Sequence, residues 1–347
     1  MPVAAQVWRM CWDNNEMSDP GLDPRITPGA HVCLARLIRL DRVDNLVSEA
    51  SIVAERVGLH RDNVAVQRSS GVARALRRRP STWECYLRPM SFVSVDDRGL
   101  VRWVTMSSPG AKNAIPKVGW GELAEAFEGF EASDQRALVV IGADGDFSAG
   151  ADLGADFSGF GTAAANAEYM KLPNRAALAL HRISKPTVAA VDGVAVGAGM
   201  NLALGCDVVI ATERARFAEI FVKRGLTLDF GGTWLLPRLV GLARAREIAL
   251  TGRIVEAEEA LSIGLATLVV PASSLEDTAV EIAGALAEGA PLAQRLIKVA
   301  LDRSSSMTFE QSLAYEEQAQ AVLLGSEDLF EGAAAFFQKR PPEFKGR

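Results

Sequence analysis

The chain has 347 residues, of which 49% are hydrophobic and 23% are charged, and its formal net charge is −6. This composition is that of an ordinary globular protein, and the length suits one large domain with an appendage. The acidic balance argues against a general nucleic-acid surface, which needs clusters of lysine and arginine. No uninterrupted apolar stretch reaches the ~18 residues that span a bilayer, and the first residues lack the pattern of a secretory signal. We therefore expect a cytoplasmic protein without a membrane span.

The cysteines and histidines offer little from which to build a metal site. Cys11, Cys33, Cys85 and Cys206 show no C-x-x-C spacing, and the chain has 3 histidines. Disulfides are rare in the cytosol. We expect unpaired thiols and no bound metal.

Residues 1–90 differ in composition from the rest of the chain. They contain thirteen arginines and ten acidic residues, whereas all eight lysines lie further on. Acidic residues argue against a transit peptide, and apolar residues at helical spacing between Val43 and Val57 indicate one helix. We predict that residues 1–90 are an extension, poorly ordered or partly helical, and that Met90 is a sensible start for the functional chain.

From Ser91 onward, strand and helix patterns alternate. Alternating or continuous apolar runs predict strands, and three- and four-residue spacing predicts helices. In chain order these are a strand at 101–106, a helix at 119–132, a strand at 137–142, a helix at 165–182, a strand at 187–191, a helix at 200–205 and a strand at 207–211. This order predicts an α/β fold with right-handed crossovers.

Two turns of small residues, Phe147–Asp152 and Gly193–Asn201, each follow an apolar run. The second turn opens a helix, whose first amides lack intrahelical acceptors and whose dipole favours negative charge. Two such amides directed at one point form an oxyanion hole, which stabilises an enolate or a tetrahedral intermediate. Simple loop closure is the alternative, because glycine in loops usually serves backbone conformation.

The same two turns belong to an ordered set of motifs over residues 91–347. The other members of the set are Pro109–Ile115, Ile183–Gly193, Ala215–Phe217, Gly231–Gly241, Thr251–Arg253, Glu259–Ala260 and Gly264–Leu265. In this order they resemble the crotonase, or enoyl-CoA hydratase/isomerase, superfamily. The resemblance implies a crotonase-like ββα spiral at 91–270 and a helical C-terminal trimerisation part at 271–347. It also implies a homotrimer or a dimer of trimers.

The resemblance assigns the two oxyanion amides to Ala151 and Ala198. Hydratases of the family use two glutamates to hold and activate water, and the corresponding positions here are Asn201 and Phe221. Neither side chain can accept and return a proton in that way. Glu219, two places before Phe221, takes the role only if the chain shifts locally, and the ungapped spacing around it disfavours that shift.

Asp229 stands just before the Gly-Gly-Thr-Trp sequence at 231–234. Enoyl-CoA isomerases and phenylacetate-pathway isomerases of the family carry an acid there. Their single carboxylate removes a proton beside the thioester carbonyl and delivers it two carbons along. We expect neighbouring aromatic residues to raise the pKa of Asp229 toward working pH. Taken alone, Asp229 also suits a helix cap near Gly231.

The resemblance further implies an acyl-CoA thioester as substrate, with coenzyme A as part of it and no separate cofactor. The substrate-binding residues that it implies are Lys112, Ala149, Asp152, Leu153, Asn201, Phe221, Trp234 and, from a neighbouring subunit, Lys339. We expect an enoyl-CoA isomerase that forms an enolate with Asp229 as its base. An enoyl-CoA hydratase and a non-catalytic acyl-CoA-binding paralogue are the alternatives.

Overall fold

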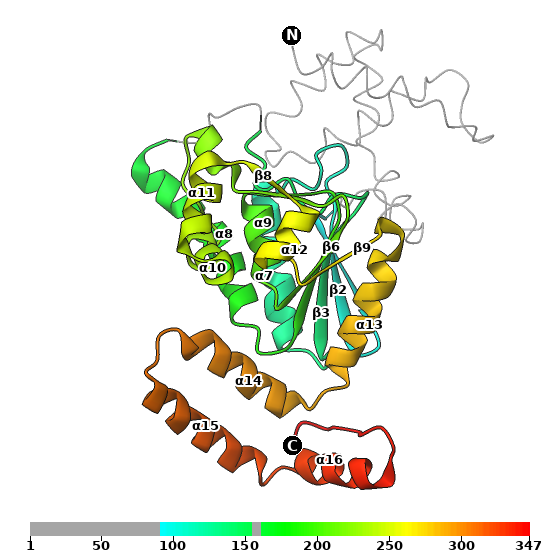
Figure 1. The fold of residues 1–347 in the computed structure, drawn as a ribbon. Coiled ribbons are helices and arrows are strands. Elements are labelled where there is room, and N and C mark those ends of the chain that lie inside the picture. The colour runs from blue at the N-terminus through cyan, green and yellow to red at the C-terminus, as the bar shows by residue number, and fades with distance from the viewer. Residues whose placement is uncertain (1–90, 155–160) are drawn as a thin grey trace, which may run out of the picture. The chain divides into compact units, whose positions relative to one another are not determined.

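A six-stranded sheet forms the centre of the fold (Figure 1). In the computed structural model, which describes residues 91–154 and 161–347, neighbouring strands of this sheet are parallel except for β1 and β2. In sheet order the strands are β1 (Val93–Arg98), β2 (Val101–Met106), β3 (Ala137–Gly142), β4 (Thr187–Val191), β6 (Val208–Thr212) and β9 (Leu268–Val270). The four predicted strands are confirmed to within one residue. The helix predicted between Val43 and Val57 lies outside the described residues.

A second, smaller sheet is built from short strands, two of which come directly after strands of the large sheet along the chain. Its strands are β5 (Val194–Val196), β7 (Arg216–Ala218) and β8 (Ile254–Glu256). Two isolated parallel bridges, Ile115 with Ala151 and Ser148 with Ala195, continue the same pattern. Each successive turn of the chain therefore contributes a longer strand to the large sheet and then a short extended segment, which belongs to the second sheet or to one of these bridges. This arrangement is the predicted ββα spiral.

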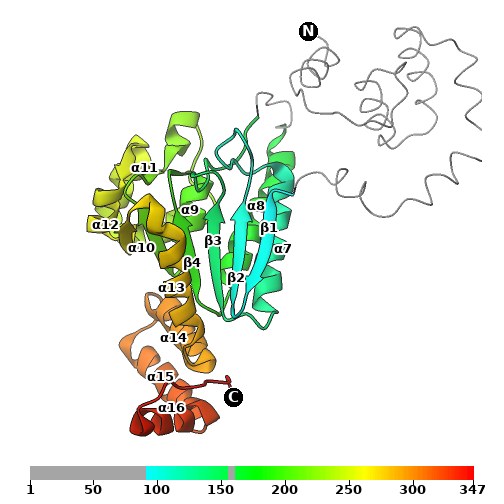
Figure 2. The same ribbon diagram turned by 90° about the vertical axis from the view of Figure 1, so that its right-hand side faces the viewer.

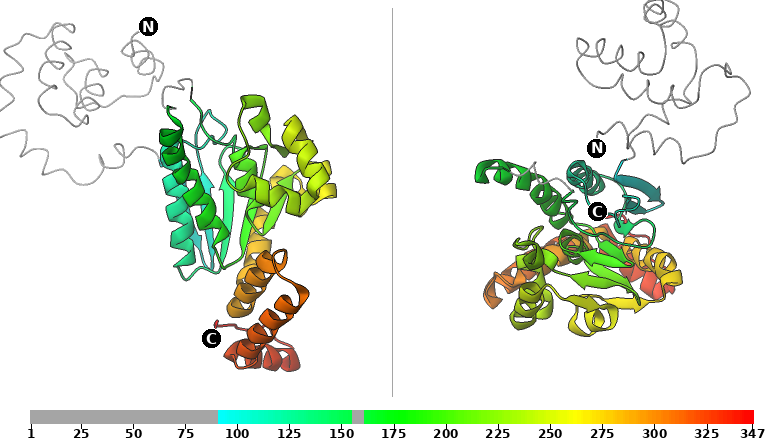
Figure 3. Two further views of the ribbon diagram at one scale, coloured as in Figure 1. Left: turned by 90° about the vertical axis from the view of Figure 1, so that its left-hand side faces the viewer. Right: turned by 90° about the horizontal axis from the view of Figure 1, so that it is seen from above.

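Helices cover both faces of the large sheet, and α7 and α8 run side by side along one of them (Figures 2 and 3). The α-helices are α7 (Lys117–Glu131), α8 (Ala163–His181), α9 (Ala198–Leu204), α10 (Gly232–Val240), α11 (Leu242–Thr251), α12 (Ala257–Ile263), α13 (Leu275–Ala287), α14 (Pro291–Ser304), α15 (Phe309–Leu323) and α16 (Glu327–Gln338). Short 3-10 helices occur at η3 (Ile220–Arg224) and η4 (Ala272–Ser274). Within the described ranges, no helix is long and apolar enough to cross a bilayer.

Two clusters of buried side chains hold these layers together. Helix α13 places Leu275, Ala279, Ala283 and Ala287 against one face of the large sheet. Their four-residue spacing gives the helix a single apolar stripe. The other face is covered by α7, α8 and α9, which bury large side chains such as Trp120. Each large side chain buried in this way stabilises the fold by roughly 1.5–3 kcal/mol.

The last three helices, α14 to α16, extend beyond one end of the large sheet (Figure 1). Polar contacts fix them to residues that precede the parallel strands. Lys298 of α14 donates to Asp207 at 2.7 Å, just before β6, and Arg136, just before β3, donates to the carbonyl of Phe344 at 2.8 Å. These contacts lie at the amino ends of the strands, whereas the two small-residue turns follow the carboxyl ends of β3 and β4.

Candidate active site

The turn after β3 leaves one backbone amide unpaired. Every amide from residue 147 to 150, and that of Asp152, donates a hydrogen bond, whereas the amide of Ala151 donates none to a described residue. Ile115 flanks the free amide: its N–H donates to Gly150 O at 2.7 Å, and its carbonyl accepts from Asp152 N at 2.9 Å. Because alternate amides of an extended segment point in opposite directions, the N–H of Ala151 points away from Ile115.

The turn after β4 supplies a second unpaired amide. Gly197 precedes α9 with φ 57° and ψ −126°, a conformation that glycine adopts far more easily than other residues. Its amide donates to Ala218 O at 2.8 Å, and its carbonyl accepts from Asn201 N at 3.0 Å. Ala198 is the first residue of α9, so its N–H has no intrahelical acceptor, and no described residue outside the helix accepts it.

The two turns are held against each other. Ser148 N donates to Val194 O at 2.9 Å, and Val196 N donates to Ser148 O at 3.0 Å. Gly150 permits the close approach, because a Cβ there would lie 2.6 Å from Val196 O and 3.5 Å from Ala198 N. The arrangement thus places two unpaired amides on adjoining segments, as donors to one oxyanion must be.

Three polar residues from different segments lie close together beside α9. Asn201 lies on α9, Glu219 lies between β7 and η3, and Asp229 lies in the loop before α10. The Asn201 amide Nδ2 is 3.0 Å from the Asp229 main-chain oxygen and 3.5 Å from Glu219 Oε2. Asn201 and Glu219 are 0% exposed. We call these three side chains the acidic cluster.

Glycine makes room for the acidic cluster. A Cβ at Gly232 would lie 2.4 Å from Asn201 Nδ2 and 2.7 Å from its Cγ. Such a contact cannot form without displacement of the Asn201 amide. Gly232, the first residue of α10, therefore has a packing role in addition to its role in the turn.

Both carboxyl groups of the cluster bind protons more tightly than usual. Burial raises the pKa of Glu219 to about 8, and the nearby charge of Asp229 adds to the effect, while the Asn201 hydrogen bond opposes it. Burial raises the pKa of Asp229 to about 6. Near neutral pH, Glu219 is therefore mainly protonated and Asp229 mainly ionised. Two carboxyl groups whose pKa values differ in this way provide one general acid and one general base at the same pH.

Three oxygens of the cluster lack a hydrogen-bond donor among the described residues. They are Asn201 Oδ1, Glu219 Oε1 and Asp229 Oδ1, each shielded from solvent. A buried polar atom without a partner costs about 1–3 kcal/mol, so native proteins rarely keep several together without a function. The cluster therefore has free capacity to bind a donor or to take part in proton transfer.

The structure differs from the sequence argument at Glu219. The resemblance assigns Phe221 to the second glutamate position and the spacing disfavours Glu219, whereas in the structure the carboxyl group of Glu219 lies beside Asn201. Glu219 directly follows β7, where the chain leaves the strand and enters η3, and its side chain is 0% exposed. Phe221 lies two residues after Glu219, in η3, and its ring would be 3.5 Å from a Cβ at Gly197.

Asp229 does not cap the helix that follows it. Helix α10 has Gly231 as its N-cap residue, and no side-chain hydrogen bond caps it. The capping role is therefore absent, and the charge of Asp229 instead lies close enough to Glu219 to raise the pKa of that residue.

Residues expected to contact coenzyme A lie around the first turn. Lys112 is exposed, forms an ion pair with Asp146 at 3.8 Å, and accepts a hydrogen bond from Ala149 N at 2.9 Å through its carbonyl. Asp152, which is exposed, and Leu153, which is half-buried, directly follow the free amide of Ala151. The structure thus brings these four residues to the same turn.

Trp234 and Lys339 lie in other surroundings. Trp234, on α10, has the guanidinium of Arg238 3.9 Å from its ring centroid and the ring of His181 at 5.4 Å. Lys339 ends α16, one of the helices fixed to the amino ends of the strands. Within one chain, Lys339 is therefore not brought to the acidic cluster.

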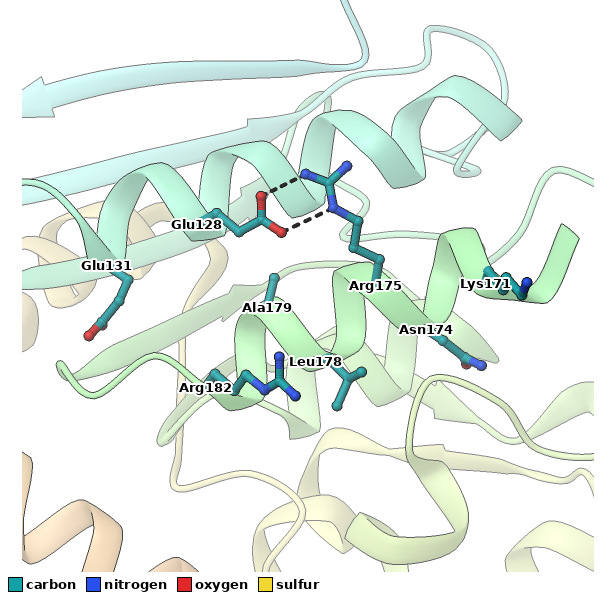
Figure 4. Close-up of a pocket in the computed structure, with 8 residues that line it drawn as sticks. All are labelled: Glu128, Glu131, Lys171, Asn174, Arg175, Leu178, Ala179 and Arg182. Carbon is teal, nitrogen blue, oxygen red and sulfur yellow. Dashed lines mark hydrogen bonds and ion pairs between the residues drawn. The ribbon is translucent and has the colours of Figure 1, made fainter. Parts of the chain in front are cut away.

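A separate groove of about 490 Å³ lies between α7 and α8 (Figure 4). Arg175 of α8 and Glu128 of α7 form a bidentate ion pair across it. The groove is lined by Glu128, Glu131, Lys171, Asn174, Arg175, Leu178, Ala179 and Arg182. None of these residues belongs to the two amide turns or to the acidic cluster.

Comparison with known proteins assigns this combination of fold and site to a family. Residues 97–347 match the model of the enoyl-CoA hydratase/isomerase family. The chain belongs to this family, within the crotonase superfamily.

The relatives of this chain include proteins named as hydratases and proteins named as isomerases. A 1,2-epoxyphenylacetyl-CoA isomerase of Escherichia coli K12 is 38% identical over 251 residues, which cover 71% of this chain and 95% of that protein. A short-chain-enoyl-CoA hydratase of Clostridium acetobutylicum is 35% identical over 258 residues, covering 74% and 98%. The crystal structure of an enoyl-CoA hydratase from Bacillus anthracis has a TM-score of 0.70 at 31% identity, covering 74% of this chain and 100% of that one. The predicted family and fold are confirmed.

Proposed function

We propose that this chain is an enoyl-CoA isomerase, which moves a double bond along an acyl-CoA thioester with Asp229 as its base. The observation that carries the proposal is the state of Asp229. Its Oδ1 is buried and has no donor among the described residues, and its pKa is raised to about 6. A carboxylate with that pKa is ionised at neutral pH and is a stronger base than an exposed aspartate.

The proposed reaction has two proton transfers. Asp229 takes a proton from the carbon next to the thioester carbonyl, and the C–H electrons form an enolate whose charge rests on the thioester oxygen. The free amides of Ala151 and Ala198 donate to that oxygen. One such donor typically lowers the activation free energy by ~3 kcal/mol. Asp229 then returns the proton two carbons along, and the electrons move back as the double bond shifts.

Substrate and assembly form the second part of the proposal. Lys112 and the backbone of Ala149, Asp152 and Leu153 would hold the coenzyme A portion, since they surround the first amide turn. Lys339 would reach this portion only from a neighbouring copy, in a homotrimer or a dimer of trimers. A cytoplasmic location accords with the free, buried thiol of Cys206.

Hydration of a 2-enoyl-CoA is the second candidate, and the unpartnered oxygens favour it. A water bound among Asn201, Glu219 and Asp229 could donate to two of these oxygens. Asp229 would accept a proton from the water while the water oxygen attacks C3 of the enoyl group. Protonated Glu219 would deliver a proton to C2, the carbon next to the thioester carbonyl. Hydration thus needs both acids, whereas the isomerisation needs only Asp229.

The test is solvent exchange of the substrate's acidic C–H protons in deuterated buffer, followed together with turnover of 3-enoyl- and 2-enoyl-CoA. We expect Asp229→Asn to lower exchange and isomerisation by ~10²-fold or more, the usual contribution of a general base. Asp277→Asn, at an exposed aspartate of α13, is the matched control. Glu219→Gln should spare isomerisation but abolish any hydration. Equal exchange by the wild type and Asp229→Asn would rule out Asp229 as the base.

A further inference from the structure

The residue that follows Asp229 has an unfavourable backbone conformation. Gly232 N donates to Asp229 O at 2.9 Å, and the two residues between them, Phe230 and Gly231, have φ values of 49° and 87°. Positive φ at both central positions is the pattern of a type I′ turn, which prefers Asn, Asp or Gly at the first of them. Of the five non-glycine residues at positive φ in the described ranges, Phe230 alone has an apolar side chain.

Packing of the Phe230 ring compensates for this conformation. The side chain is 3% exposed, and its centroid lies 5.9 Å from that of Trp120 at an interplanar angle of 35°. Trp120 is itself buried on α7, and its Nε1 donates to the Tyr169 hydroxyl of α8 at 3.4 Å. The ring thus joins the loop that carries Asp229 to the layer of α7 and α8. Strained residues persist only where their surroundings determine them, and they cluster at functional sites.

The Asp229 backbone is therefore fixed from two directions. Its carbonyl accepts from Gly232 N within the turn and from Asn201 Nδ2 at 3.0 Å. On the other side, the next residue is anchored through its ring to Trp120. These two attachments fix the main chain on both sides of the Asp229 carboxyl group.

We propose that Phe230 is a positioning residue, whose ring, anchored on Trp120, holds the Asp229–Gly232 turn closed and keeps the Asp229 carboxylate within the acidic cluster. The proposal rests on the proposed role of Asp229 as base. A residue that merely filled the core would affect folding but not the protonation of Asp229.

Phe230→Gly separates these two roles, because it removes the ring while fitting the left-handed backbone. We expect kcat for isomerisation to fall ~10-fold or more with little change in KM, since a more solvated Asp229 is a weaker base. The pKa in the pH profile should fall from about 6 toward the ordinary aspartate value of about 4. Phe230→Leu, which keeps an apolar side chain on Trp120, should restore most of the activity and the profile.

Phe130→Leu is the matched control, because Phe130 is a fully buried aromatic residue of α7 outside the site. It should lower stability and leave the pH profile unchanged. Should Phe230→Gly fail to fold, Trp120→Phe weakens the same anchor from the other side and should lower the same pKa to a smaller extent.

Direct titration of Asp229 separates this proposal from the proposed function. The carboxyl signal is followed by ¹³C NMR in aspartate-labelled protein and assigned with Asp229→Asn, so that no turnover is needed. A lower Asp229 pKa in Phe230→Gly, but not in Phe130→Leu, supports the positioning role. An unchanged pKa overturns it, whatever the activity. If Asp229→Asn catalyses exchange of the substrate's C–H protons as fast as the wild type does, the proposed function fails. The titration of Asp229 in the wild type and in Phe230→Gly still decides the role of Phe230.

Discussion

At the scale of single residues, Glu219 and Asp229 carry different charges near neutral pH although both are carboxylic acids. Glu219 is fully enclosed and lies in the field of Asp229, which raises its pKa to about 8, whereas Asp229 is half-buried and has a pKa of about 6. The protein thus keeps one acid and one base within the reach of Asn201. Burial raises both pKa values, and the charge of Asp229 raises that of Glu219 further.

The raised pKa of Glu219 makes stability depend on pH. Between the ordinary glutamate value of 4.5 and about 8, the native state holds a proton that the unfolded chain releases. The contribution is therefore fully present below pH 4.5 and falls by roughly 1.4 kcal/mol per pH unit until it is lost as pH passes about 8. Glu219→Gln should flatten this decline, so that the free energy of unfolding of the variant rises relative to that of the wild type as pH approaches 8. Urea unfolding across the pH range measures it.

Glu125→Gln is the control for that experiment, because Glu125 is exposed on α7. Its stability curve should follow the wild type. A Glu219→Gln curve parallel to the wild type would show that Glu219 is not protonated in the native state.

Sequence reasoning reached the members of the site to different degrees. The family resemblance pointed to Ala151, Ala198 and Asp229, and the structure places the first two in the turns that follow β3 and β4, and Asp229 in the loop before α10. Glu219 was undervalued, because its approach to Asn201 depends on how the chain leaves β7 and enters η3. The left-handed Phe230 gave no signal, since an aromatic residue is unexpected at that position.

At the scale of elements, strand burial decided what could be predicted. Strands β2, β3 and β4 are mainly buried and apolar, and the prediction gave their bounds. β1 was not predicted because five of its six residues are exposed. β5, β7 and β8 have 3 residues each, too few for a periodic pattern to develop. These short strands form the second sheet, which carries the amide turns.

Helix α9 allows its N-terminal amide to be tested alone. Proline is tolerated at the first position of a helix, and Gly197 has no Cβ to clash with the proline ring. Ala198→Pro should therefore keep the fold, as judged by circular dichroism, but remove the N–H. We expect kcat to fall by ~10²–10³-fold.

Leu242→Pro is the matched control and should keep full activity, because Leu242 is the exposed first residue of α11 and also follows a glycine N-cap residue, Gly241. Unchanged activity in Ala198→Pro would mean that this amide does not contact the thioester oxygen.

At the scale of the whole molecule, the helices α14 to α16 leave apolar side chains uncovered. Phe336 and Phe337 are 79% and 82% exposed, and Phe309 and Phe330 are also exposed. Such surface usually marks an interface. We predict a trimeric or hexameric mass by light scattering at micromolar concentration, and a lower mass for the double variant Phe336→Glu, Phe337→Glu. A monomeric wild type would contradict this assembly.

The described residues also predict how the chain responds to truncation. Among the described residues, the two buried clusters already cover both faces of the large sheet. A chain that starts at Met90 should therefore show the same helix content, assembly and turnover as the full chain. Loss of folding in that shortened chain would show that residues 1–90 contribute to the core.

The pairing of successive spiral turns has a consequence for the order of folding. The two amide turns are joined by contacts between residues far apart in the chain, such as Val194 N with Asp146 Oδ1, 48 positions away. Contacts of this kind require closure of long loops, so they form late and slow the folding rate. A helix such as α7 can form from local contacts alone, but the pair of amides exists only after two consecutive turns have stacked. During refolding, catalytic activity should therefore return after helical structure does.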